Sequence, residues 1–390
     1  MNHYAQLLKL RCIGNTSEKE LKFSGNIEDN NAINKLWISA EKISMLSDRI
    51  ISTLRMTTLR SNTKIQEIIS RELGLHCLGV QKRTDTGVIN DVWSVACKEG
   101  LFYLKKYSRS MKDVVLILAA EVFVKKHNIP ALAAVESKLL KVSGEYYALY
   151  PKSPGLQVPA HNLSDAALFD MGVTLAKIHA VSTTRLAVPL RKINTRWDTE
   201  QFVKKAKDLR EKIMQQVPKT AFDQMALKNL NLKLEEVQAL SLNKKLDLGR
   251  TTIVHGDFTP DNIFLKAKKV VGIIDWEKSG SQPASLEVVR SLLYICFRDN
   301  LYNDAAFLRA RSFLRGYQSI YQLDTEVFAD ALHAHHAKQL HSTWIETEHY
   351  LKGEHRADIF LAQKWQANKY FVKQLRDFTK KIVGIVSAHR

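Results

Sequence analysis

Residues 251–277 carry the most structural information in this chain, and they read TTIVHGDFTPDNIFLKAKKVVGIIDWE. Two short apolar runs, residues 263–265 and 270–274, flank a polar turn, so they can pair as a β-hairpin. Such pairing brings Asn262 and Asp275 towards the same end of the hairpin and close to Asp257. The sequence therefore predicts a cluster of two carboxylates and one amide oxygen.

A cluster of this composition suits phosphoryl transfer. That reaction needs hard oxygen ligands for the magnesium on the nucleotide phosphates, and a carboxylate that orients the attacking hydroxyl and accepts its proton. We predict Asp257 as the catalytic base, and Asn262 and Asp275 as the metal ligands. His255, Asp257 and Asn262 also have the spacing of the kinase catalytic loop H-R-D-x-x-x-x-N, although D-W-E replaces D-F-G at Asp275.

The motif HGDFTPDN at residues 255–262, followed by GIIDWE at residues 272–277, resembles the aminoglycoside phosphotransferase and choline-kinase-like superfamily. Members of that superfamily phosphorylate hydroxyl groups of small molecules. The resemblance covers about Thr63 to the C-terminus. It implies a protein-kinase-like fold in which a nucleotide lies between a small sheet lobe and a helical lobe, with ATP and Mg²⁺ as cofactors.

The resemblance also implies roles for residues outside the motif. Gly87 lies in a segment that looks like the family's phosphate-covering turn, where glycine lets the backbone approach the phosphates. Lys105 is similar to the family's nucleotide-phosphate lysine, with Lys106 as its rival, because strand alternation turns only one of them towards the nucleotide. Glu121 stands where the lysine's ion-pair partner is expected, and Tyr150 where the hinge backbone meets adenine.

Three further features are expected to support the catalytic loop. Residues 171–179 look like the helix that the family places behind this loop. His255 is expected to hold the loop by hydrogen bonding rather than to act as a base, because Asp257 already has that role. Glu287 stands where many relatives have an aspartate.

The fold class predicted from these patterns is α+β, a two-lobed protein-kinase-like fold with a small β-rich N-lobe and a larger, mainly helical C-lobe. We assign residues 61–150 to the nucleotide-binding N-lobe, residues 151–390 to the catalytic and acceptor-binding C-lobe, and residues 1–60 to an N-terminal extension of unknown role. Hydrophobic periodicity predicts strands at 92–95, 101–104 and 146–150, and helices at 36–51, 111–127, 168–179, 225–242 and 327–350.

Charge and composition narrow the choice of partners. The chain has 58 basic and 40 acidic residues, and its net charge of +18 favours anionic ligands. The basic residues are spread out, so a dedicated nucleic-acid site is not expected. A polycationic antibiotic also fits poorly, and we expect a small hydroxyl acceptor that is neutral or anionic. The four cysteines are far apart and no apolar run is long enough to span a membrane, which together favour the cytoplasm.

Several alternatives remain beside this reading. The chain could be a catalytically silent nucleotide-binding or scaffolding relative with a basic surface, although retention of Lys105, Asp257, Asn262 and Asp275 speaks against it. The histidines of residues 333–341 are not expected to converge on one metal ion, since they share a predicted helix. The aromatic residues near 344–350 could line a substrate pocket or belong to the core.

Overall fold

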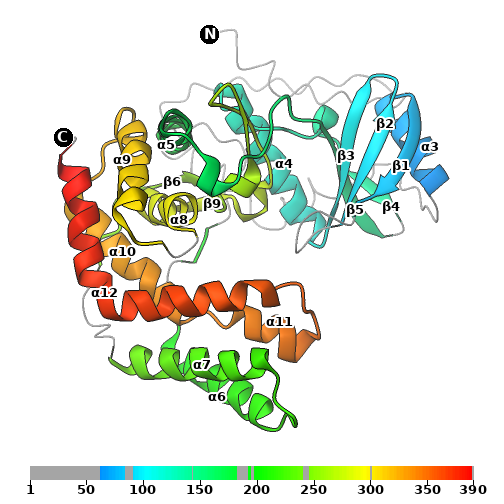
Figure 1. Cartoon of the computed structure of the whole chain (residues 1–390). Helices are drawn as coiled ribbons and strands as arrows, with labels where there is room; N and C mark the ends of the chain where they lie inside the picture. The colour runs from blue at the N-terminus through cyan, green and yellow to red at the C-terminus, as the bar shows by residue number, and fades with distance from the viewer. Residues whose placement is uncertain are drawn as a thin grey trace, which may run out of the picture. The chain divides into compact units, whose positions relative to one another are not determined.

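The computed structural model describes residues 62–83, 91–142, 144–181, 192–194, 197–239, 246–298 and 301–388. Residues 61–140 and 145–390 form one compact unit (Figure 1). The predicted N-terminal extension, with its helix at 36–51, and Gly87 lie outside the described residues. The proposed division at residue 150 remains a prediction.

The N-terminal part of this unit is built around a five-stranded sheet with the strand order β1-β2-β3-β5-β4. Neighbouring strands from β1 to β5 pair antiparallel, and Lys105 in β3 lies opposite Ala148 in β5. The strands are β1 (Cys77–Lys82), β2 (Val92–Cys97), β3 (Gly100–Tyr107), β4 (Leu140–Val142) and β5 (Glu145–Pro151). The predicted sheet-rich N-terminal part is thus confirmed.

Two helices accompany the sheet: α3 (Asn62–Leu73) and α4 (Met111–Lys126). The side chain of Ser110 accepts a hydrogen bond from the backbone N–H of Asp113, which caps the start of α4. Asn128 has a left-handed backbone with φ 60°, and Pro130 follows, so α4 ends close to the predicted boundary. The helix directs Glu121 into the interior, where the residue is 2% exposed.

The remainder of the chain is mainly helical, as predicted. Its α-helices are α5 (Asp165–Ala180), α6 (Thr199–Met214), α7 (Ala221–Ala239), α8 (Ala284–Cys296), α9 (Asp304–Gln318), α10 (Thr325–Leu340), α11 (Trp344–Lys352) and α12 (Leu361–Ser387). Short 3₁₀ turns occur at η1 (Val135–Ser137), η2 (Ala160–Asn162), η4 (Pro260–Asn262), η5 (Trp276–Lys278) and η6 (Asp358–Phe360). Among the described residues, no helix combines the length and apolar character needed to cross a bilayer.

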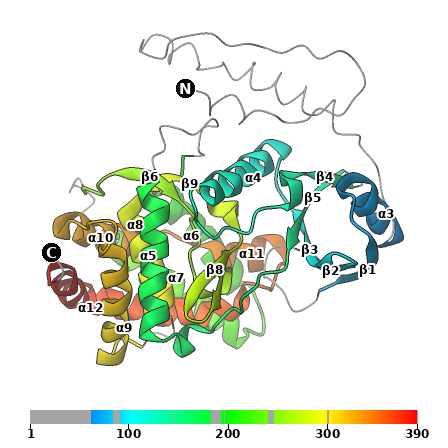
Figure 2. The same cartoon turned by 90° about the horizontal axis from the view of Figure 1, so that it is seen from above.

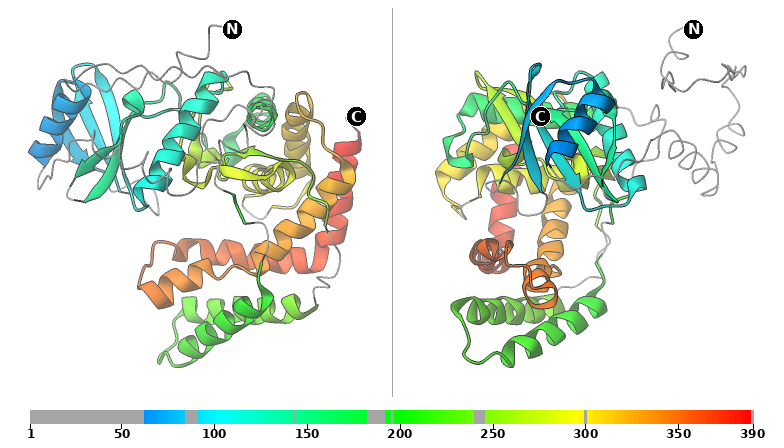
Figure 3. Two further views of the ribbon diagram at one scale, coloured as in Figure 1. Left: turned by 180° about the vertical axis from the view of Figure 1, so that it is seen from behind. Right: turned by 90° about the vertical axis from the view of Figure 1, so that its right-hand side faces the viewer.

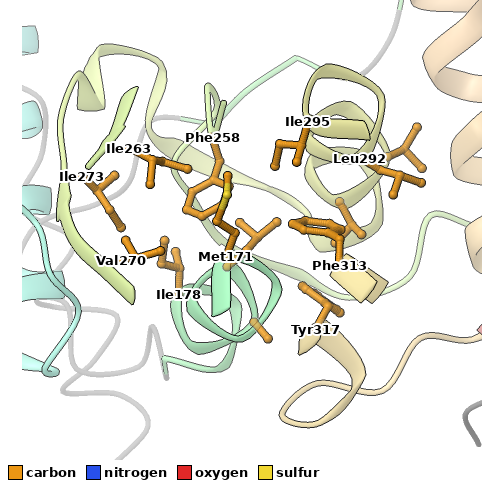
Figure 4. Packing of buried hydrophobic residues seen from close by; sticks show 14 of the residues in the cluster. Met171, Ile178, Phe258, Ile263, Val270, Ile273, Leu292, Ile295, Phe313 and Tyr317 are labelled. Carbon is orange, nitrogen blue, oxygen red and sulfur yellow. The ribbon is translucent and has the colours of Figure 1, made fainter. Parts of the chain in front are cut away.

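Helices α5 and α9 lie side by side (Figure 2), and glycine makes their close approach possible. A Cβ atom at Gly172 would lie 2.1 Å from the carbonyl oxygen of Phe313, and one at Gly316 would lie 1.9 Å from that of Phe169. Any larger residue at either position would push the helices apart. This pair supports the loop that follows β6 (Thr251–Val254), because its side chains enter the same core as Phe258 of that loop (Figure 4).

Within the described part of the chain, the buried apolar residues form two clusters. The larger cluster joins α4, α5, α8, α9, α10 and the end of α12 to the hairpin of residues 263–273. The smaller cluster lies where α6 and α7 meet α11 and the beginning of α12 (Figure 3), and includes Phe202, Leu230 and Ile345. The first half of α12 contacts α7 through Asn368 and α10 through Lys364, and its second half contacts α9 through Phe378 (Figure 1).

Two small sheets hold the motif that the sequence singled out. One pairs β6 (Thr251–Val254) with β9 (Gly280–Pro283), and the other pairs β7 (Ile263–Lys266) with β8 (Lys269–Ile273). Ala267 and Lys268 have φ of 49° and 67°, as both central residues of a tight hairpin turn require. The predicted hairpin is therefore confirmed.

One predicted helix is divided in the structure. The hydrophobic periodicity of residues 327–350 predicted one continuous helix. In the structure, α10 ends at Leu340 and α11 begins at Trp344. The turn between them is anchored from a distant segment, since His341 Nε2 lies 3.0 Å from Thr199 Oγ1 and its ring contacts Trp197. A local hydrophobic pattern does not reveal such a contact.

Candidate active site

Asp257 lies on the loop that follows β6. The preceding position, 256, accommodates only glycine. Gly256 has φ 80°, and a Cβ atom there would lie 2.1 Å from the carbonyl oxygen of Lys278. The carboxylate of Asp257 binds two cations, Lys278 Nζ at 2.8 Å and Arg290 Nη2 at 2.5 Å. Burial opposes ionisation, but Arg290 and Lys278 outweigh it and lower the pKa of Asp257 to about 2.

His255 and Glu287 hold this loop in place. Glu287 is fully buried, and its carboxylate accepts hydrogen bonds from the backbone N–H groups of His255, at 2.9 Å, and Gly256. The same carboxylate lies 3.0 Å from His179 Nε2 on α5. Burial raises the pKa of Glu287, yet His179 reverses the effect and leaves that pKa below its ordinary value. A glutamate therefore occupies the supporting position that the family resemblance assigned to an aspartate.

The ring of His255 links the loop that carries Asp257 to the segment that carries Asp275. Its Nε2 donates to the carbonyl oxygen of Ile274 at 2.9 Å, and its Nδ1 accepts from the backbone N–H of Asp257 at 3.1 Å. Burial lowers the pKa of His255, which favours this neutral form. The contacts are those of a residue that positions the loop, as the sequence predicted.

The hairpin brings Asn262 and Asp275 together with Asp257. Asn262 Nδ2 donates to the backbone carbonyl of Asp257 at 2.9 Å, and the Asn262 carbonyl accepts from the N–H of Ile274 at 3.0 Å. The amide oxygen of Asn262 is therefore the atom left for a ligand. Asp275 has a left-handed backbone with φ 64°, a conformation that aspartate tolerates better than most residues.

Lys105 reaches this cluster from the sheet. Its Nζ lies 2.7 Å from Asp275 Oδ1 and 2.7 Å from Glu277 Oε1, while Arg109 Nε donates to Glu277 Oε2 at 2.9 Å. Burial disfavours the charged lysine, but Asp275 and Glu277 raise the pKa of Lys105 above its ordinary value. Lys106 is directed elsewhere, with its Nζ 3.1 Å from Glu145 Oε1. Of the two lysines left open by the sequence, Lys105 is the one beside Asp275.

Glu121 is not an ion-pair partner of Lys105 in this structure. One of its carboxylate oxygens accepts from the hydroxyl of Tyr150 at 3.0 Å, and the other from the backbone N–H of Ala134 at 3.3 Å. Burial raises the pKa of Glu121 to about 8. The expected pair is absent among the described residues because Asp275 and Glu277 occupy the ammonium group of Lys105.

Tyr150 is buried in β5, and its backbone lies opposite Tyr103 of β3. The strand continues to Pro151, and the N–H of Lys152 still donates to the carbonyl of Leu101 at 3.0 Å. The chain therefore remains paired with β3 up to Lys152. The predicted contact between Tyr150 and adenine stays a prediction.

Sequence reasoning assigned no role to Glu277, Lys278 or Arg290, all of which contact the predicted site residues. Glu277 is the last residue of the quoted motif and Lys278 follows it, so their place in the sequence could have indicated that they lie near Asp275. Arg290 lies on α8, one turn after Glu287, and nothing in its local sequence marks it. Its contact with Asp257 depends on how α8 packs against β6.

The donor set fits a magnesium–nucleotide complex. The carboxylates of Asp275 and Glu277 and the amide oxygen of Asn262 are hard oxygen ligands, which Mg²⁺ prefers. Lys105, with a side chain 13% exposed, adds a positive charge suited to phosphate. Chemically, the arrangement can hold a cation and phosphates beside an ionised carboxylate.

A scan against family models finds a match to the phosphotransferase enzyme family over residues 81–323. The match spans well over half of the chain, so this protein belongs to that family. The resemblance drawn from residues 255–262 and 272–277 is thereby confirmed, and the protein is a transferase of the kinase type. A search of curated protein sequences finds no match.

Solved structures show the same fold at low sequence identity. The spectinomycin phosphotransferase, solved with ADP and spectinomycin, is 16% identical, with a TM-score of 0.56 over 85% of this chain and 98% of that one. An aminoglycoside phosphotransferase from Alicyclobacillus acidocaldarius subsp. acidocaldarius is 15% identical, with a TM-score of 0.52 over 79% of this chain and 92% of that one. The fold is the kinase-like α+β fold expected from the sequence.

Proposed function

We propose that this protein is an ATP- and magnesium-dependent kinase that transfers the γ-phosphoryl group to a hydroxyl of a small molecule. The proposal rests mainly on one observation: Asp257, Asn262, Asp275 and Lys105 lie close together. The side chain of Asn262 donates to the backbone of Asp257, and Lys105 forms a salt bridge with Asp275. Membership of a phosphotransferase family supports it.

Asp257 would orient the acceptor hydroxyl and accept its proton. Arg290 and Lys278 keep its pKa at about 2, so the carboxylate is ionised at neutral pH but weakly basic. A weak base suffices because the transition state for phosphoryl transfer is loose and the hydroxyl loses its proton late. The main contribution of Asp257 is then to position the nucleophile.

Lys105 would bind the nucleotide phosphates. A lysine ammonium group has three N–H donors, and Asp275 and Glu277 take two of them, which leaves one for a phosphate oxygen. Asn262 and Asp275 would hold Mg²⁺, with Glu277 as a further candidate ligand. When bound, Mg²⁺ neutralises charge on the phosphates during transfer.

The acceptor site is proposed to be a cavity between α8, α10 and α12. Among the described residues, no Asp or Glu lines it, whereas its wall combines aromatic with basic or neutral polar side chains: Tyr294, Phe297, Arg298, His335, Gln339 and Lys364. Such a lining fits a neutral or anionic acceptor with an apolar part and disfavours a polycation.

The cavity is connected to the catalytic loop by two arginines. The guanidinium group of Arg290, which binds Asp257, lies 4.9 Å from the ring centre of Tyr294 in the cavity wall. Arg298 lies 2.8 Å from Asp261 in the catalytic loop. An acceptor in this cavity would therefore be next to the elements that hold Asp257.

The test is ATP consumption with magnesium across neutral, anionic and polycationic hydroxyl compounds, with Asp257→Ala protein beside the wild type. We expect acceptor-dependent turnover in the wild type and its loss in the variant, with nucleotide binding largely retained. Wild-type rates in Asp257→Ala would refute the role of Asp257. Nucleotide binding without turnover on any acceptor would favour a silent scaffold instead.

We also propose that the protein acts in the cytoplasm. Cys77, Cys97 and Cys296 are free thiols, which fits a reducing compartment. Cell fractionation with an antibody against the protein would test this, and recovery outside the cytoplasmic fraction would contradict it.

A further inference from the structure

Three side chains at the end of α11 bring their ligand atoms together, away from the residues proposed for catalysis. His349 Nδ1 lies 2.8 Å from Asp358 Oδ2, and His355 Nδ1 lies 3.3 Å from the same oxygen. The two Nδ1 atoms are 3.1 Å apart. His349 belongs to α11, His355 to the following turn and Asp358 to η6.

With Asp358 ionised, every placement of hydrogens on the two Nδ1 atoms leaves one of the three contacts without a hydrogen bond; if His349 donates to both neighbours, His355 Nδ1 and Asp358 Oδ2 are two acceptors 3.3 Å apart. If both Nδ1 atoms carry a hydrogen and donate to Asp358, no hydrogen bond joins the two nitrogens, which lie 3.1 Å apart. If His349 instead accepts from His355, its lone pair faces the acceptor oxygen of Asp358 at 2.8 Å. A metal ion removes the conflict, because all three atoms then direct lone pairs at one positive centre.

A second observation points in the same direction. The other carboxylate oxygen of Asp358, Oδ1, is buried and has no hydrogen-bond partner among the described residues. An unpartnered buried acceptor is costly, and a bound cation or its water would stabilise it. Hydrogen bonds within the triad therefore do not account for Asp358.

The surrounding structure holds the ligand residues in place. Gly353 ends α11 with φ 68°, and the N–H of Glu354 donates to the carbonyl of Glu348 at 2.9 Å, which turns the chain back towards His349. The ring of His349 stacks on Phe222 of α7, with centres 4.2 Å apart. The position of His349 is thus fixed by packing before any ion binds.

We propose that His349, His355 and Asp358 form a binding site for a divalent transition-metal ion of the Zn²⁺ class. Two imidazole nitrogens and one carboxylate oxygen suit Zn²⁺, whereas Mg²⁺ and Ca²⁺ prefer oxygen ligands throughout. Zn–N and Zn–O bonds of about 2.0–2.1 Å in a tetrahedron place ligand atoms about 3.3 Å apart. The three separations in the structure, 2.8, 3.1 and 3.3 Å, are near that value.

The ion would have a structural role. It would tie the end of α11 to η6, which leads directly into α12 at Leu361. One turn further, α12 carries Lys364, a residue of the cavity wall. Metal binding would therefore stabilise the start of α12, where the smaller apolar cluster joins α6 and α7.

The test uses the full chain, freed of metal by a chelator and kept in reducing buffer with excess Mg²⁺, so that oxygen-only sites are occupied. Titration with Co²⁺ should show one equivalent bound with the strong visible absorption of a tetrahedral site, and Zn²⁺ should displace it. Zn²⁺ should also raise the thermal unfolding temperature.

The variants His355→Ala and Asp358→Asn should bind Co²⁺ at least about tenfold more weakly and lose the thermal shift. His355 is exposed, so its truncation should not disturb the core. The matched control is His161→Ala, an exposed histidine on η2 that should leave both signals unchanged. Absence of stoichiometric Co²⁺ binding, or equal binding in wild type and both variants, would overturn the proposal.

Discussion

Asp257 and Glu121 are both largely buried carboxyl groups of the same compact unit, yet their surroundings shift their pKa values in opposite directions. Burial raises the pKa of each group. At Asp257, two cations outweigh burial and the pKa falls to about 2. Among the described residues, Glu121 receives hydrogen bonds from Tyr150 and Ala134, and neither these nor the charge of Lys105 outweighs burial, so its pKa rises to about 8. The neighbours of a buried carboxyl group, and not burial alone, decide whether it is charged at neutral pH.

The most direct test of the difference between the two carboxyl groups is to remove the charge from Asp257. The isosteric change Asp257→Asn keeps the shape of the side chain but removes its negative charge and replaces one of its two acceptor oxygens with an NH₂ donor. We expect kcat to fall by about 10³-fold, within the usual range for loss of a general base. The measurement is steady-state turnover on the best acceptor, and an Asp257→Asn enzyme with kcat within about tenfold of wild type would contradict the assignment.

Removing one cation at a time should sharpen the comparison. Arg290 is mostly buried and binds Asp257 at 2.5 Å, whereas the side chain of Lys278 is 47% exposed and binds at 2.8 Å. Arg290→Met should therefore lower kcat by about 10²-fold, and Lys278→Met by less, because solvent screens the exposed pair. Equal losses in the two variants would show that burial of the pair is not what matters.

Glu121 offers the opposite test, in stability rather than rate. Its pKa in the folded protein, about 8, lies above the ordinary value of 4.5, so the folded state holds the proton more tightly than the unfolded state. The free energy of unfolding should thus fall as pH rises from about 4.5 to 8, by at most about 1.4 kcal/mol per pH unit from this group.

The variant Glu121→Gln should remove that part of the pH dependence. The difference in unfolding temperature, Glu121→Gln minus wild type, should be larger at pH 8 than at pH 5, as measured by thermal scans at both values. Glu67→Gln, at an exposed glutamate of α3, is the matched control. A constant difference between Glu121→Gln and wild type at the two pH values would show that Glu121 does not titrate in this range.

The smallest expected effect concerns the acceptor. Lys364 donates to the hydroxyl of Tyr294 at 2.9 Å and to Gln339 at 2.8 Å in the cavity wall. Lys364→Met should raise KM for an anionic acceptor by about tenfold with little change in KM for ATP. Lys373→Met, at an exposed position on the same helix, is the control, and an equal change in both variants would argue against the cavity as the acceptor site.

Much of the candidate site was predictable because its central part is local in sequence. Asp257, Asn262 and Asp275 lie within 19 consecutive residues, 257–275, and the hairpin between them follows from two apolar runs and a turn. The strands and helices near Lys105 and Glu121 were also predictable from periodicity. Short-range pairing leaves few alternatives, so residue spacing alone placed these side chains near one another.

The sequence of this protein thus determined its fold class, its family and the position of the proposed phosphoryl-transfer residues. Only the tertiary structure decided that Lys105 binds Glu277 instead of Glu121, that Arg290 reaches Asp257, and that the chain reversal after Gly353 brings His355 to His349. The reason is physical: burial and charge at a side chain depend on neighbours from distant segments, and residue spacing carries little information about how those segments pack.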